Sequence, residues 1–82
     1  MKSLRVATCQ FSVEPDISHN RNETLRLMQK AHKEGADIAH FSECALSGYA
    51  GVDIPDSKSI DWTQLTLATH EIMSLAQELK MW

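Results

Sequence analysis

Long hydrophobic runs are missing from this sequence. A transmembrane helix needs about 18 consecutive apolar residues, and no stretch of the 82 residues comes close. Lys2 and Arg5 interrupt the start of the chain, and the apolar run Val6 to Cys9 is too short for the core of a signal peptide. We therefore expect neither a membrane partner nor export.

Cysteine is scarce, and no segment of the chain is strongly basic or strongly acidic. Two cysteines, Cys9 and Cys44, are too few for a disulfide framework, which favours a cytoplasmic chain with reduced thiols. The net charge is -3, and four basic residues share one predicted helical stretch with Glu23 and Glu34. Such mixing is typical of a solvated helix face, so we expect no nucleic-acid partner.

Glycine and proline are also few, at 3 and 2 residues. That scarcity argues against collagen-like, disordered and low-complexity chains, and hydrophobic and charged fractions of 43% and 23% suit a globular protein. A chain of this length forms one small domain at most. It buries only roughly 60% of its unfolded surface, so its stability should be marginal.

Two short segments, 4–11 and 37–45, are rich in apolar and β-forming residues. Each is predicted to be a strand. Side chains alternate along a strand, so Glu43 and Cys44 should point to opposite faces of the second one. A loop rich in turn-forming residues should follow.

Two further segments have helical spacing. The first should begin near Asn20, which forms a capping-box pattern with Glu23, and should end at Gly35. The second should run from about Asp61, a suitable N-cap, to Lys80. Its apolar stripe consists of Leu65, Ala68, Ile72, Leu75, Ala76 and Leu79.

The order strand, helix, strand, helix predicts an α/β fold with a right-handed crossover and two parallel strands. A parallel sheet needs cover on both faces, which two helices cannot supply. We therefore expect residues 1–82 to be the incomplete N-terminal part of one larger domain. Met81 and Trp82 would then suit the beginning of a third strand.

Three segments resemble the start of the nitrilase or carbon–nitrogen hydrolase superfamily. The segment LRVATCQF carries the A-x-x-Q pattern of the family's first strand in Ala7 and Gln10, and a helix ending in EGAD follows. The segment FSECALSGY then matches the family's glutamate in Glu43 and its Gly-Tyr turn in Gly48 and Tyr49. The resemblance covers nearly the whole chain.

This resemblance implies both a fold and a chemistry. The complete domain would be a four-layer α-β-β-α sandwich, of which this chain is a βαβα fragment. Members cleave small amides or nitriles with a glutamate, a lysine and a cysteine, use no metal or organic cofactor, and commonly form homo-oligomers. Glu43 would be the general base that takes the thiol proton and later activates water. Without the resemblance, the favoured interpretation of Glu43 would be a strand-end glutamate that points to water.

The lysine and the nucleophilic cysteine of the family have no match here. Cys44 should point away from Glu43, and Cys9 should lie inside the first strand, so both should be small buried hydrophobes. Lys58, in a loop, and Lys80, at a helix end, should be solvated. We therefore expect the isolated chain to be inactive.

Other interpretations stay open. In the family, the turn that contains Tyr49 borders the substrate pocket, so its ring could line the pocket or could anchor the loop on the core. The four histidines lack the spacing of metal ligands, so we expect no metal site. The chain could also be a non-catalytic βαβα module that binds a protein partner through an open sheet edge and apolar faces.

Overall fold

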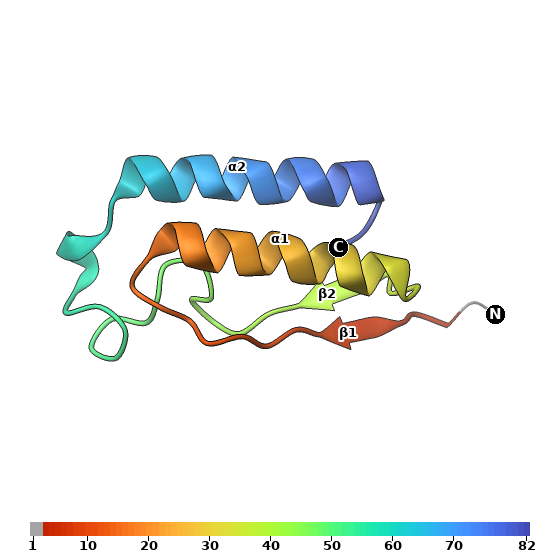
Figure 1. The fold of residues 1–82 in the computed structure, drawn as a ribbon, viewed down its shortest axis with the longest axis horizontal. Helices are drawn as coiled ribbons and strands as arrows, with labels where there is room; N and C mark the ends of the chain where they lie inside the picture. Colours follow the sequence, from red (N-terminus) through yellow and green to blue (C-terminus); the bar gives the residue numbers. More distant parts are fainter. Residues whose placement is uncertain (1–2) are drawn as a thin grey trace.

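The computed structural model describes residues 3–82, so Met1 and Lys2, which entered the signal-peptide argument, lie outside the described residues. Figure 1 shows a mixed α/β arrangement, as predicted. In chain order its elements are β1 (Val6–Thr8), α1 (Ile17–Lys33), β2 (Ile38–His40), the short 3-10 helix η1 (Ser57–Ser59) and α2 (Trp62–Leu79). Within residues 3–82, no helix has the length and apolar character needed to cross a membrane.

The strands β1 and β2 form a parallel pair, as the alternation of elements predicts. Val6 lies opposite Ile38, and Thr8 lies opposite His40. The pairing extends one residue further, because the Cys9 N–H donates to the His40 carbonyl at 2.8 Å. The loops that follow both strands therefore leave the sheet at the same edge.

The backbone of Trp82 lies along the other side of β2. Its N–H donates to the Asp37 carbonyl at 3.0 Å, and its carbonyl accepts from the Ala39 N–H at 2.8 Å. These two bonds flank Ile38 in the pattern of parallel neighbours. Trp82 thus pairs with β2 as a neighbouring parallel strand would, at the position where the sequence predicts a third strand to begin.

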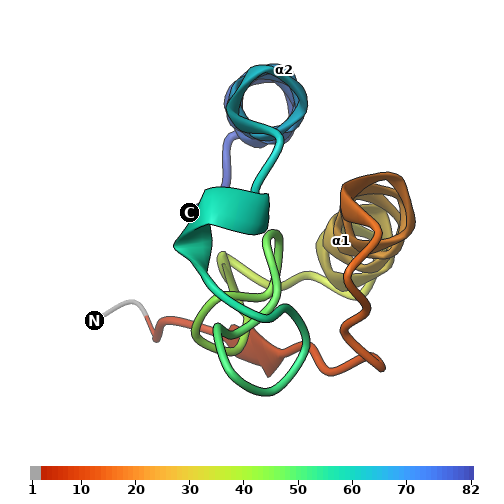
Figure 2. The same cartoon turned by 90° about the vertical axis from the view of Figure 1, so that its left-hand side faces the viewer.

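Both helices lie on the same side of the sheet (Figures 1 and 2). The helix α1 packs against both β2 and α2. Polar contacts also join the two helices: Gln64 Nε2 donates to Ser18 Oγ at 2.8 Å, and the Arg21 guanidinium lies 3.3 Å from the Glu71 carboxylate. Gln64 thus contacts the neighbouring helix instead of closing a capping box with Asp61.

The helix α1 begins earlier than predicted. Asp16 is its N-cap, because its Oδ1 accepts from the Ser18 N–H at 2.9 Å, and the prediction that Asn20 caps the helix is wrong. Gly35, with a φ of 85°, follows the helix end as expected. For α2 the prediction is confirmed: Asp61 accepts from the Gln64 N–H at 3.0 Å, and the helix ends just before Lys80.

Both strands are shorter than the predicted ranges 4–11 and 37–45. Beyond His40 the backbone closes on itself: the Ala45 N–H donates to the Ser42 carbonyl at 3.2 Å. Those polar groups then serve a turn instead of a sheet ladder. The second strand therefore ends before Glu43.

The core lies between the sheet and the C-terminal halves of the helices. Its buried members are Cys9, Ala31 and Met81. Partly buried around them are Ala7, Leu27, Ala36, Ala39, Phe41 and Leu79. In the predicted α2 stripe, Ala68 is buried and the other members are partly exposed, because α1 covers only one flank of that helix.

Candidate functional site

The candidate site is the edge of the sheet formed by the carboxyl ends of both strands, next to the loops that follow them. Open parallel sheets bind their ligands at this edge. Phe11, after β1, meets Phe41, after β2, edge to face with ring centroids 6.5 Å apart. His19 of α1 packs against Phe11 in the same way at 6.3 Å. The three rings thus form an aromatic cluster beside the two loops.

Glu43 opens the turn Glu43–Ser47 that follows β2, and its side chain is exposed. None of the salt bridges within residues 3–82 includes it. The prediction that Glu43 and Cys44 point to opposite faces of the second strand is wrong, because the strand stops at His40. Ala39 and Phe41 pack on the core. The orientation of Glu43 is therefore set by the turn and not by strand alternation.

Backbone hydrogen bonds define this turn. The Gly48 N–H donates to the Cys44 carbonyl at 2.9 Å. Cys44 has a φ of 56°, a left-handed conformation that is uncommon outside glycine. Gly48 has a φ of 87° and is buried, and a Cβ there would lie 2.9 Å from the Asp53 Cβ. The turn is thus compact and closely packed against the next loop.

The two cysteines differ in environment. Cys44 is exposed, so the prediction of a buried hydrophobe is wrong for this residue, because the turn carries it out of the sheet. Cys9 is buried as predicted, although it lies just after β1, and burial raises the pKa of its thiol. A buried thiol with a raised pKa is a poor nucleophile. The predicted solvation of Lys58 and Lys80 is confirmed, since both are exposed.

The backbone of Tyr49 anchors the loop that follows the turn. Its N–H donates to Asp53 Oδ2 at 2.7 Å, and its carbonyl accepts from the Val52 and Asp53 N–H groups at 3.0 and 2.8 Å. The residue as a whole is 48% exposed. Both roles of the ring, lining a substrate pocket and anchoring the loop on the core, stay predictions.

Sequence reasoning missed the role of Asn20. Its side chain is fully buried and bonds to Glu14 and Leu46, in the two loops at this edge of the sheet. The signal for an earlier helix start is Asp16, a residue type favoured at the N-cap, directly before the apolar Ile17. Asn20 then falls inside the helix, where asparagine is disfavoured and needs a separate explanation.

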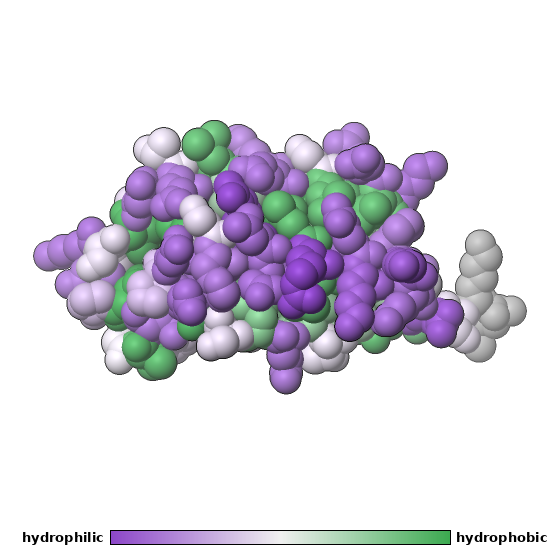
Figure 3. Space-filling model, viewed as in Figure 1, coloured by the Kyte–Doolittle hydropathy of each residue, from purple (hydrophilic) through white to green (hydrophobic). Residues whose placement is uncertain are grey.

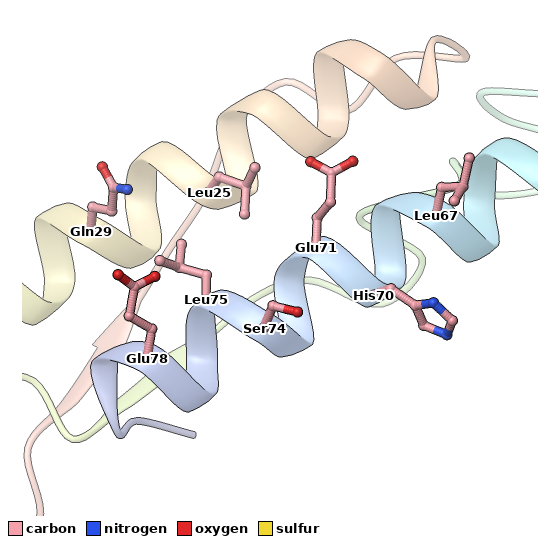
Figure 4. A pocket seen from close by; sticks show the side chains of 8 residues that line it. All are labelled: Leu25, Gln29, Leu67, His70, Glu71, Ser74, Leu75 and Glu78. Carbon is pink, nitrogen blue, oxygen red and sulfur yellow. The ribbon is translucent and has the colours of Figure 1, made fainter.

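A groove of about 520 Å³ runs between α1 and α2. In Figure 4, Leu25 and Leu75 approach one another across it, while His70 points away. Figure 3 shows hydrophobic surface between the helices near the C-terminal end of α2. Glu43 does not line this groove. The groove is the seam between two packed helices and brings no set of catalytic groups together.

Within residues 3–82, no three His, Cys, Asp or Glu side chains are grouped so that they could hold a metal ion. The ionisable groups at the sheet edge are Glu43, the exposed Cys44, and a pair formed by Glu14 and His19, whose Oε2 and Nδ1 lie 3.7 Å apart. His19 also contacts the Ser12 carbonyl through Nε2 at 3.1 Å. Among the described residues, Glu43 thus offers an accessible carboxylate that takes part in none of the salt bridges.

The sequence profile of the family described as carbon-nitrogen hydrolase matches residues 5–82. This range includes the whole sheet edge, with Glu43, Gly48 and Tyr49. Comparison with curated proteins and with solved structures gave no significant match.

Proposed function

Because the chain belongs to the carbon–nitrogen hydrolase family, we propose that it forms the N-terminal part of a domain that cleaves non-peptide carbon–nitrogen bonds. Glu43 is the general base in this proposal. The observation that carries it is the position of Glu43: the residue that matches the family's glutamate begins the turn after β2, at the ligand-binding edge of a parallel sheet.

The proposed chemistry explains why the carboxylate is accessible. A cysteine thiol passes its proton to Glu43 as the sulfur attacks the carbonyl carbon of a small amide. Glu43 returns that proton to the departing amine as the C–N bond breaks and a thioester forms, and the ionised Glu43 then deprotonates the water that hydrolyses the thioester to the acid and the free thiol. A nitrile carbon would first give a thioimidate, which one water converts to the thioester with release of ammonia. A lysine stabilises the negative charge that develops on the substrate. In this chain no residue matches that lysine or that cysteine, and the proposal assigns both to a segment outside residues 1–82.

The complete domain is proposed to be a four-layer α-β-β-α sandwich that forms homo-oligomers. The hydrogen bonds of Trp82 to Asp37 and Ala39 support a sheet that continues beyond β2. The outward face of α2 supports it as well, because Trp62 and Met73 are exposed there. A wider sheet with further elements would cover such side chains.

The 82-residue chain alone should hydrolyse no amide or nitrile, because it contributes a base without a positioned thiol. The purified chain, incubated with a panel of simple amides and nitriles, should release no ammonia above the buffer rate. Turnover that disappears in Cys44→Ser would contradict this expectation, and it would identify the exposed Cys44 as a nucleophile.

In the complete enzyme, Glu43→Gln should lower kcat by roughly 10²–10⁴-fold, the contribution typical of a general base. Glutamine keeps the size of the side chain but cannot accept the proton, so kcat should fall more than KM rises. The melting temperature should change little, because the carboxylate forms no salt bridge within residues 3–82. A near wild-type kcat would end the proposal.

A non-catalytic interaction module is the second candidate, and the exposure of Trp62, Met73 and Trp82 favours it. The same side chains are those a completed domain would cover. The coding sequence after Trp82 separates the two functions. A strand that ends in lysine and then a strand, turn and helix that carry cysteine would support the hydrolase, while a stop codon would favour the module.

A further inference from the structure

The fully buried Asn20 uses its entire amide group. Its Oδ1 accepts from the Glu14 N–H at 2.9 Å, and its Nδ2 donates to the Glu14 carbonyl at 2.7 Å and to the Leu46 carbonyl at 2.9 Å. An amide has one acceptor oxygen and two donor hydrogens, and each has a partner here. None of these bonds lies within α1, so they do not serve the helix itself.

The two partners of Asn20 come from different loops at the candidate site. Glu14 lies between β1 and α1, and Leu46 lies in the turn Glu43–Ser47. The same loops are in close contact elsewhere, because a Cβ on Gly48 would lie 3.5 Å from the Glu14 carbonyl oxygen. Asn20 therefore joins the loops that leave the carboxyl ends of both strands.

We propose that Asn20 is a positioning residue that holds the turn of Glu43 in place for the hydrolytic reaction, an inference that rests on the proposed role of Glu43. Leu46 is three residues from Glu43, within a turn closed by the bond from the Gly48 N–H to the Cys44 carbonyl at 2.9 Å. Because the Glu43 carboxylate has no salt bridge among residues 3–82, the backbone of this turn sets where it points.

The chemistry of the site requires asparagine. An aspartate would keep the acceptor for Glu14 but would turn a carboxylate oxygen toward the carbonyls of Glu14 and Leu46, which need a donor. A serine is too short to span three backbone groups, and a glutamine adds a methylene to a fully packed position. Alanine leaves the partly buried backbone groups of Glu14 and Leu46 without their side-chain partner.

Hydrogen exchange on the complete enzyme, in which the proposed remainder of the domain covers the apolar faces, tests this positioning directly. In Asn20→Ala and Asn20→Asp, the amides of Ala45 and Gly48, which close the turn, should exchange roughly 10-fold faster or more, as loss of a buried hydrogen bond predicts. Amides in the middle of α1 should keep their protection. Thr24→Val is the matched control, because Thr24 is equally buried on α1 but bonds only to the Asn20 carbonyl of its own helix.

Two exchange results would overturn the proposal. One is an unchanged turn in both Asn20 variants. The other is a loss of protection throughout α1 that matches the loss in the turn, since Asn20 would then be a general stabiliser of the fold. Both variants are measured, so that if one of them folds poorly the other decides.

The steady-state kinetics of the complete enzyme supply the second readout. Asn20→Ala should lower kcat on the order of 10–10²-fold with a smaller change in KM, because a misplaced base acts on the reaction step. Asn20→Asp should recover part of the activity at low pH, where a protonated carboxyl can donate to one carbonyl, and Thr24→Val should leave kcat unchanged. Unchanged kcat in both Asn20 variants would overturn the positioning role, whereas unchanged kcat in Glu43→Gln would overturn the proposed function itself.

Discussion

Individual residues in this chain take their roles from the turns that hold them. Glu43 and Cys44 are adjacent, and both are exposed because they lie beyond the end of β2. Cys9, which also follows a strand, is buried because its N–H still pairs with the His40 carbonyl at 2.8 Å and its side chain points into the core. Cys9 and Cys44 thus differ in burial because only Cys9 is still held by the pairing of the strands.

The two cysteines should react with a thiol reagent at very different rates. Cys44 is exposed, whereas Cys9 is 6% exposed and burial raises the pKa of its thiol, which lowers the thiolate fraction at a given pH. With a chromogenic disulfide at mildly alkaline pH, one thiol should react quickly and the other slowly. Cys44→Ser should remove the fast phase and Cys9→Ala the slow one. Equal rates for the two thiols would contradict the burial of Cys9.

At the scale of elements, the connections decide more than the helices and strands do. The helices begin at ordinary caps, Asp16 and Asp61, which accept from backbone N–H groups of their first turns. The loops at the sheet edge instead depend on one buried amide, Asn20, and on a left-handed backbone at Gly48 and Gly51. Substitutions in these loops should therefore be the more disruptive.

Gly48 and Gly51 provide a matched test of this packing. Their φ angles are 87° and 83°, so alanine carries a similar left-handed cost of about 1–2 kcal/mol at either position. A Cβ at Gly48 would also lie 2.9 Å from the Asp53 Cβ, whereas nothing lies within 4 Å of one at Gly51. Gly48→Ala should therefore lower the free energy of unfolding by about 1–3 kcal/mol more than Gly51→Ala does, because of overpacking. Its urea midpoint should be correspondingly lower. Equal midpoints would contradict this prediction and would show that the loop moves to accommodate the added methyl group at no cost.

At the scale of the whole molecule, the apolar surface is only partly covered. The helices shield one side of a two-stranded sheet, and Trp62, Met73 and Trp82 remain exposed. The pairing of Trp82 with β2 and the exposed face of α2 lie where a wider sheet would extend. The proposal of a larger domain would account for this exposed apolar surface.

The isolated chain should self-associate or be partly unfolded in solution. Its sheet has free edges and its helices have uncovered apolar faces, and both favour contacts between copies. Sedimentation velocity should show a weight-average mass that rises with concentration. Trp62→Lys should reduce that rise, while Thr63→Lys, an exposed polar position beside it, should not. A monomer with a sharp, cooperative thermal transition would oppose this prediction and would favour the interaction module.

The sequence by itself determined the order of elements, the parallel pairing and the family. These follow from local patterns: β-rich apolar segments, helical spacing, the Asp61 cap and the residues around Glu43. The tertiary structure alone decided where β2 ends, the exposure of Cys44 and the burial of Asn20. The first two depend on the turn that closes after His40, and the third depends on backbone groups of Glu14 and Leu46 that meet at one amide. No local pattern records which carbonyl that amide will reach.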